Sequence, residues 1–432
     1  MRRPIAVPAV AATLLCLAVS ACGTGNSSST NASDGGKATE LRAGPGVDVA
    51  AKTISIGDIN ALTGPAAPLG NAVAAGHRAF FDGLNARGGI DGWKVKLTVK
   101  DSGYKPQEHV QLYNELQGSV AILNSFGSPT TKAIQPQVDQ QKIVTFPASF
   151  DSLWGADSVM APVGAPYSVD IANVLDYYTE SGAKKAKIGI IYQNDEYGAD
   201  GLRGFKAAKS ALGFTDAGQQ SFNAGDTSFT AQVQKLKAGG AQAVVVTALP
   251  SATGPIVGTA ATLGFKPQWI LQGPSYLEQL ITKDGSVDAP ATPVAPALKG
   301  ALVTSFAAPW GDAKTPGMKQ LVADHGRYSA KLPPSIYFTV AYAQGQVQAA
   351  ILRKAIQSGN LTREGILTAK QNLGTVDLGG ITPSVSYQPQ PGPPTRKSLI
   401  TRIDPTVPGF LEAVAPDHGS KVADSLKIGR GP

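Results

Sequence analysis

The chain has 432 residues, of which 42% are hydrophobic and 16% are charged, and its formal net charge is +7. This length allows two domains of ordinary size, and the composition excludes an intrinsically disordered chain. The basic residues are dispersed, without a lysine and arginine block or a basic stripe with interleaved aromatic residues. The sequence therefore predicts no nucleic-acid partner.

The N-terminus has the pattern of a secretory signal. Two arginines precede an apolar run over residues 5–17, which is shorter than the roughly 20 apolar residues of a membrane-spanning helix. Residues 19–22 read Val-Ser-Ala-Cys and resemble the lipobox of bacterial lipoproteins, although an ordinary cleavage site is the alternative. We therefore expect residues 1–22 to be a lipoprotein signal peptide with a lipidated Cys22, and the protein to be anchored on the extracytoplasmic face of the cell membrane.

The segments that flank the folded part are predicted to be irregular. Residues 23–50 are expected to form a flexible tether, because the stretch begins with many Ser, Gly, Asn and Thr residues. Residues 416–432 have few apolar positions, so we expect a frayed tail. The second cysteine, Cys16, lies inside the signal, which leaves the mature chain without a disulfide.

Strand and helix patterns alternate from Thr53 onward. Some strand segments alternate apolar with polar residues, and others, such as residues 120–123 and 143–146, are short apolar runs typical of central parallel strands; both kinds alternate with segments of helical apolar spacing. The expected strands cover residues 54–56, 93–99, 120–123, 143–146, 188–192, 243–247 and 269–271, and the expected helices of the second half cover residues 200–212 and 227–237. This alternation predicts an α/β fold with two doubly wound, Rossmann-like parallel sheets.

Several segments together resemble type I periplasmic binding proteins of the leucine/isoleucine/valine-binding family. The resemblance covers roughly residues 52–412, and it is carried by Asn60 to Pro65, Leu84 to Gly92, Asp101 with Tyr104 and Pro106, Ser125 to Thr131, Phe146 to Ala148, Asn194 to Gly198 and Tyr337 to Ala350. It implies two lobes joined by three crossovers, which we place near Val163, Ser305 and Gly380. The first lobe would comprise residues 51–163 and 305–379, and the second residues 164–304 and 380–415.

The segment after the strand at residues 120–123 is predicted to begin a helix. Ser128 suits the N-cap position, with Pro129 at the first helical position, and the backbone N–H groups of Thr130 and Thr131 then lie at the positive end of the helix dipole. Such a helix start suits a ligand carboxylate, although a capped helix without a ligand is the alternative.

The resemblance adds roles for four residues at the carboxyl ends of the strands, where doubly wound sheets bind their ligands. It implies that Ser128 holds a ligand carboxylate and that Ala148 offers its backbone. It also implies that Tyr197 reaches the ligand from the second lobe, and that Leu69 selects the shape of the ligand side chain.

Two departures from the family argue against a branched-chain amino acid as the ligand. Phe150 replaces a threonine that fixes the amino-acid head, and Ser275 replaces a glutamate that balances the buried ammonium. Tyr104 and Gly127 stand where the family has the cysteines of a disulfide. We therefore hypothesise that the ligand is a small carboxylate, amide or aromatic compound and that Ser275 and Tyr276 are among the residues that bind it. An aromatic-rich pocket could be formed by Phe126, Phe150, Trp154, Tyr197 and Tyr276. The missing charge could instead come from Asp151 or Glu278.

The sequence favours a binding protein over an enzyme. None of its four histidines, His77, His109, His325 and His418, is spaced for metal ligation with another, and no nucleophile elbow or phosphate-binding loop is present. We expect no cofactor and no metal. The resemblance implies a monomer that captures a small molecule and delivers it to an ABC permease and its ATPase. The alternative is a sensor lipoprotein that signals to a separate membrane receptor or kinase.

Overall fold

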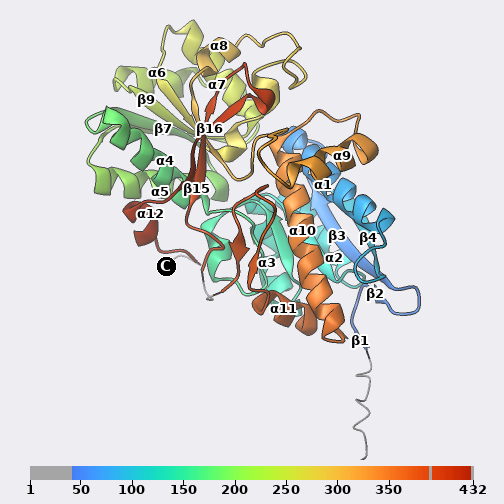
Figure 1. The fold of residues 1–432 in the computed structure, drawn as a ribbon. Coiled ribbons are helices and arrows are strands. Elements are labelled where there is room, and N and C mark those ends of the chain that lie inside the picture. Colours follow the sequence, from blue (N-terminus) through green and yellow to red (C-terminus); the bar gives the residue numbers. More distant parts are fainter. Residues whose placement is uncertain (1–40, 389–391, 430–432) are drawn as a thin grey trace, which may run out of the picture. The chain divides into compact units, whose positions relative to one another are not determined.

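The structure is a computed structural model that describes residues 41–388 and 392–429 (Figure 1). The predicted signal peptide with Cys22 and residues 23–40 of the predicted tether lie outside the described residues. Within the described part, no helix combines the length and the apolar character needed to cross a membrane.

The first of two main sheets is built from residues that precede the first crossover. Its strand order is β2-β3-β5-β6, and β4 also pairs with β3. All of these pairs are parallel except β2 with β3. The strands are β2 (Val47–Asp48), β3 (Thr53–Asn60), β4 (Lys94–Asp101), β5 (Ile122–Phe126) and β6 (Thr145–Ala148). Strands β5 and β6 were predicted as buried parallel strands, and each begins two residues later than the sequence suggested.

Six helices among the described residues belong to this first lobe, which also receives chain from beyond residue 305. They are α1 (Ala67–Ala86), α2 (Pro106–Leu116), α3 (Ser128–Gln141), α9 (Met318–Tyr328), α10 (Ile336–Gln357) and α11 (Arg363–Gln371). Helices α1 and α10 lie side by side (Figure 1). Glycines permit this close approach, because a Cβ atom on Gly76 would lie 2.5 Å from the carbonyl oxygen of Phe338. The packing fixes the first turn of α10, which carries Tyr337.

The second sheet has the strand order β16-β15-β11-β10-β9-β7-β8. Its strands are β7 (Lys187–Gln193), β8 (Thr215–Phe222), β9 (Ala243–Thr247), β10 (Gln268–Leu271), β11 (Leu302–Ser305), β15 (Ser398–Ile403) and β16 (Leu411–His418). The first five run parallel, as the fold class predicted, although β8 and β11 were not among the predicted strands; β15 and β16 are antiparallel additions at one edge. The helices of this lobe are α4 (Tyr167–Tyr178), α5 (Glu196–Leu212), α6 (Thr230–Ala238), α7 (Pro250–Thr262), α8 (Ala295–Leu298) and α12 (Lys421–Ser425).

The chain passes between the two sheets three times in the described residues. It leaves the first sheet after β6, returns after β11 to form α9 to α11, and re-enters the second sheet at β15. Two small strand pairs complete the fold: β1 (Arg42–Ala43) pairs with β12 (Asn360–Leu361), and β13 (Thr375–Val376) pairs with β14 (Val385–Ser386). The predicted class, two doubly wound α/β lobes, is confirmed.

Two predictions about irregular segments are wrong where the structure describes them. Residues 41–50, assigned to the tether, contain β1 and β2, which pair with the first lobe. Residues 416–429, assigned to a frayed tail, contain the end of β16 and helix α12. Helix α12 packs against α4 and α5 because Val422 and Leu426, four residues apart, share one buried face of this short segment.

Candidate functional site

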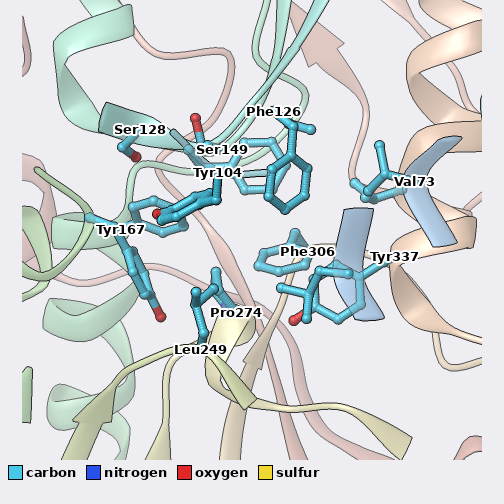
Figure 2. Close-up of a pocket in the computed structure, with 16 residues that line it drawn as sticks. Val73, Tyr104, Phe126, Ser128, Ser149, Tyr167, Leu249, Pro274, Phe306 and Tyr337 are labelled. Carbon is cyan, nitrogen blue, oxygen red and sulfur yellow. The ribbon is translucent and has the colours of Figure 1, made fainter. Parts of the chain in front are cut away.

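A cavity of about 40 Å³ lies between the two lobes, at the carboxyl ends of the parallel strands (Figure 2). This is the place where doubly wound sheets bind their ligands. The residues that line it are Leu69, Val73, Tyr104, Phe126, Gly127, Ser128, Ala148, Ser149, Phe150, Tyr167, Tyr197, Leu249, Pro274, Phe306, Tyr337 and Val340. Among these described residues there is no Asp, Glu, Lys, Arg or His, so the lining offers no charged side chain to a ligand.

Aromatic rings form a connected series along the cavity. Tyr197 lies edge-on to Tyr167, with ring centroids 4.8 Å apart. Tyr167 contacts Phe150 at 6.2 Å, and Phe150 contacts Phe306 at 5.0 Å. Phe306 in turn lies 6.0 Å from Tyr337. These rings come from both lobes, and their spacing is that of favourable aromatic pairs.

Ser128 is a polar residue of the cavity lining whose hydroxyl has no hydrogen-bond partner among the described residues. It is the first residue of α3, and its side-chain oxygen is buried without a hydrogen-bond partner. The prediction of Ser128 as the N-cap is wrong, because Gly127 occupies that position. Gly127 adopts a φ of +95°, and a Cβ there would lie 2.6 Å from the ring of Tyr104. This turn places the Ser128 hydroxyl at the positive end of the α3 dipole. A hydroxyl in that position suits an anionic or strongly accepting group of a ligand.

The structure does not bring Thr130 and Thr131 to the cavity, although both were predicted to bind the ligand. The hydroxyl of Thr130 donates to the carbonyl oxygens of Phe126 and Gly127. The hydroxyl of Thr131 shares a hydrogen bond of 2.6 Å with that of Ser125, and its backbone N–H donates to Gly127. Both threonines therefore brace the turn that presents Ser128.

Five further predicted residues do line the cavity, and one of them is Phe126 at the end of β5. Leu69 lies in the first turn of α1, and Ala148 ends β6. Phe150 follows β6 two residues later, and Tyr197 lies in the first turn of α5. The Tyr197 hydroxyl is 3.4 Å from the carbonyl oxygen of Ala248, to which it donates.

Ser275 and Tyr276 are turned away from the cavity, contrary to prediction. Both lie at η3 (Gly273–Ser275), a short 3-10 turn after β10. The Ser275 hydroxyl donates to the carbonyl oxygen of Val246 at 2.7 Å and accepts from the backbone N–H of Ala248 at 3.0 Å. The Tyr276 hydroxyl donates to Gly409 at 3.0 Å. Both side chains therefore stabilise the second lobe.

Trp154 does not line the cavity either, although the sequence suggested it for the aromatic pocket. Its ring is buried among apolar side chains of the first lobe, in η1 (Ser152–Ala156). Its indole N–H donates to the hydroxyl of Ser149 at 3.3 Å, and Ser149 itself does line the cavity.

Neither Asp151 nor Glu278 supplies the missing negative charge to the cavity. Asp151 accepts from the backbone N–H of Leu153, and burial together with the charge of Asp200 raises its pKa well above the usual range. Glu278 lies in η4 (Glu278–Leu280) and accepts from the backbone N–H of Ile336, at the start of α10, at 2.8 Å. Burial raises the pKa of Glu278 to about 7.

Sequence reasoning missed other aromatic residues of the lining. Tyr104 was noted only for the family resemblance and the lost disulfide, and Tyr337 only as part of the family resemblance. Tyr167 and Phe306 each follow a crossover, at the start of α4 and at the end of β11 respectively. The sequence could have indicated both residues only by their position, because each lies within a few residues of a predicted crossover between the lobes.

Polar contacts hold the lobes together around the cavity. The Tyr104 hydroxyl donates to Asp195 at 3.3 Å, and the Lys132 ammonium contacts Glu196 at 2.9 Å. On the side of α10, the Tyr337 hydroxyl donates to the carbonyl oxygens of Gly273 at 2.8 Å and Tyr276 at 2.9 Å.

One group of potential metal ligands exists among the described residues, and it lies outside the cavity lining. Asp176 and Glu180 follow each other by one helical turn, and His418 in β16 contacts Asp176 at 3.0 Å. None of the three belongs to the site described above.

The chain is similar to known proteins in both sequence and structure. A family model for periplasmic binding proteins matches residues 53–407. The Leu/Ile/Val-binding protein homolog 3 of Brucella melitensis is 32% identical over 198 residues. That match covers 44% of this chain and 53% of the relative, so the chain spans about half the length of this relative.

Solved structures match over most of their length. A fatty acid ABC transporter substrate-binding protein from Thermomonospora curvata is 27% identical, with a TM-score of 0.83 over 90% of this chain and 97% of that one. A branched chain amino acid ABC transporter protein from Thermus thermophilus with bound valine is 18% identical, with a TM-score of 0.72 over 86% and 98% of the two chains. The second likeness concerns the fold alone.

Proposed function

The chain belongs to the periplasmic binding protein family, with relatives in its leucine/isoleucine/valine-binding branch, and from this premise we propose that it is a solute-binding protein. In this proposal it captures a small molecule in the cavity between the lobes and delivers it to an ABC permease and its ATPase. It acts by binding and release rather than by catalysis.

The ligand in this proposal is a carboxylate with an apolar or aromatic body and without an ammonium group. The observation that carries it is the contrast between one unpartnered polar side chain, Ser128, and an otherwise apolar and aromatic lining. The carboxylate would accept a hydrogen bond from Ser128 at the start of α3. The name of the Thermomonospora protein, which binds fatty acids according to that name, is consistent with this class.

A free amino acid fits this cavity poorly. Its ammonium would be buried without a carboxylate partner, and burial of an unpaired charge costs several kcal/mol. The described lining has no acidic side chain. Ser275, which stands where the family has the glutamate that balances an ammonium, donates its hydroxyl to the carbonyl oxygen of Val246 and does not line the cavity. Relatives with leucine, isoleucine and valine in their names therefore indicate the family but not the ligand.

The proposal also includes secretion and lipid anchoring, which would place the binding site outside the cytoplasm. It rests on the sequence of residues 1–22 and on Cys22 in particular. Replacement Cys22→Ala should move the protein from the membrane fraction to the soluble fraction of the cell. Retention in the membrane would mean that another feature anchors the chain.

A thermal-shift screen tests the ligand class. The purified chain would be mixed with fatty acids, aromatic acids, the corresponding amides, and free amino acids. A ligand at a hundredfold excess over its Kd stabilises the folded state by about 2.7 kcal/mol, which is readily seen as a rise in Tm. Stabilisation by acids without an ammonium supports the proposal, whereas stabilisation only by leucine, isoleucine or valine contradicts the proposed ligand class.

A further inference from the structure

Phe306 occupies the centre of the apolar part of the cavity. It is the first residue after β11, so it stands at the crossover where the chain leaves the second sheet. Its ring is buried between Phe150 and Tyr337, at centroid distances of 5.0 and 6.0 Å. Figure 2 shows it facing the open space between the serine side of the cavity, with Ser128, and the side that carries Val73 and Tyr337.

Gly273 fixes where the Phe306 ring can lie. A Cβ atom on Gly273 would be 2.0 Å from Cε1 of Phe306, so only a residue without a side chain leaves room for the ring. Gly273 lies in the 3-10 turn η3, which many residues can adopt, and space is therefore the reason for glycine here. Its backbone N–H donates to the Thr304 hydroxyl at 3.0 Å, and its carbonyl oxygen accepts from Tyr337. The turn, the strand end and the ring form one rigid unit.

The far part of the cavity offers a ligand only apolar surface. The Tyr337 hydroxyl is directed at the two carbonyl oxygens of η3, and Leu69, Val73 and Val340 complete this side. A ligand held at Ser128 must therefore place its hydrocarbon part toward Phe306. How long that part can be depends on the ring.

We propose that Phe306, held in place by Gly273, is the residue that limits the size of the apolar body of the ligand. The inference rests on the proposed carboxylate ligand and adds the structural element that selects among such ligands. A matched pair of substitutions should move the limit in opposite directions. Phe306→Ala removes the wall, whereas the added methyl group of Gly273→Ala would lie 2.0 Å from the Phe306 ring and 2.7 Å from the Thr304 carbonyl oxygen, so the ring must move toward the cavity and the adjoining backbone must also shift.

The effect on binding can be expressed per methylene group. Each methylene buried in apolar surroundings contributes about 0.8 kcal/mol, which is about fourfold in affinity. In the wild-type protein, affinity should rise by about this factor along a series of straight-chain acids and then fall sharply once the chain meets Phe306. In Phe306→Ala the fall should come later in the series, and in Gly273→Ala it should come earlier.

The experiment is isothermal titration calorimetry of the purified full chain with straight-chain acids from butanoate to hexadecanoate and with benzoate, phenylacetate and phenylpropanoate. Phe306→Leu serves as a milder variant if the alanine variant is poorly folded. Phe229→Leu is the control, because Phe229 is fully buried in the second lobe outside the cavity. It should lower Tm and leave the preferred chain length unchanged.

The outcomes separate this inference from the proposed function. Opposite shifts of the preferred length in the Phe306 and Gly273 variants support the inference. An unchanged length preference in Phe306→Ala and Phe306→Leu, with the wild type binding acids, overturns the inference alone. If the wild-type protein binds none of the acids, the proposed ligand class is wrong and the inference fails with it. A length shift in the Phe229→Leu control as large as in Phe306→Leu also overturns it.

Discussion

The two walls of the cavity differ in whether their side-chain hydroxyls are hydrogen-bonded within the protein. On the first-lobe wall, the Ser128 hydroxyl has no protein partner and lies at the start of a helix. On the second-lobe wall, the Tyr197 hydroxyl is hydrogen-bonded to the carbonyl oxygen of Ala248 and to Ser275, which lies behind the wall. This difference supports the proposal that the polar group of the ligand binds the first lobe and that the second lobe contributes mainly apolar and aromatic surface.

The acidic side chain of Glu278, in the second lobe, likewise contacts protein groups rather than the cavity. Glu278, in the loop where the family resemblance implies a ligand-binding glutamate, is used for contact between the lobes at the start of α10. It faces the hydroxyl-bearing rings of Tyr276 and Tyr337, which are themselves directed at protein acceptors. Charge on this side therefore bears on folding and lobe contact rather than on ligand recognition.

The largest effect we expect concerns the pH dependence that Glu278 confers. Burial raises the pKa of Glu278 from its ordinary value of 4.5 to about 7. The folded state thus holds this proton more tightly than the unfolded state, so the contribution to stability is complete below pH 4.5 and is lost as pH rises to about 7. The loss is on the order of 3 kcal/mol, because each pH unit corresponds to about 1.4 kcal/mol.

Urea unfolding of the wild type and of Glu278→Gln at about pH 5 and about pH 8 measures this effect. The Gln variant should lose less stability over the interval, by on the order of 3 kcal/mol. Asp170, whose pKa burial raises to about 8, titrates in both proteins, so the difference between them isolates Glu278. Acid binding at about pH 5 should be similar in both, and a drop of more than about tenfold would show that Glu278 does contact the ligand.

Ser128→Ala should have the next largest effect, and it acts on affinity rather than on stability. A hydrogen bond to a charged group contributes about 1.5 to 3 kcal/mol, so Kd for a bound acid should rise by about tenfold to about a hundredfold. The Tm of the free protein should not fall, because the hydroxyl has no protein partner to lose. Calorimetric titration together with thermal unfolding tests both parts. A lower Tm with unchanged Kd would show that the Ser128 hydroxyl stabilises the fold and does not bind the ligand.

Ser275→Ala should show the opposite pattern and a smaller effect on binding. The substitution leaves the backbone N–H of Ala248 and the carbonyl oxygen of Val246 without their partner, at a cost of about 1 to 3 kcal/mol in unfolding free energy. Because the side chain does not line the cavity, Kd for acids should change by less than about threefold. A large rise in Kd without loss of stability would mean that Ser275 reaches the ligand when it is bound.

The fold was accessible from the sequence because its signals are repeated. Buried strand β9 is almost entirely apolar, β5 begins within the apolar run of residues 120–123, and each strand is followed by a helix. The antiparallel edge strands β15 and β16 lacked that repetition and were not predicted. Helix α12 is only five residues long, and so short a segment gives no periodic signal.

The site was predictable where a residue follows directly from a strand end or a helix start. Ser128 and Ala148 lie within two residues of the ends of β5 and β6, and their placement needs no knowledge of side-chain direction. Ser275 and Tyr276 depended on the 3-10 turn η3, whose rotation decides which side chains face the cavity. Phe306 and Tyr167 approach the site only through the crossovers, so their role depended on packing between lobes that sequence patterns do not contain.

The smallest effect we expect comes from the ion pair between Lys132 and Glu196 at the rim of the cavity. It links the lobes, but its side chains are 51% and 28% exposed, so water and salt screen it. Lys132→Ala should weaken acid binding by about 1.4- to fivefold at low ionic strength, and less at high salt, because exposed pairs contribute about 0.2 to 1 kcal/mol. Lys100→Ala is the matched control, since Lys100 pairs with Glu115 within the first lobe and should leave Kd unchanged. Equal effects of the two substitutions on Kd would mean that the net charge of the protein, and not the ion pair between the lobes, determines the change in acid binding.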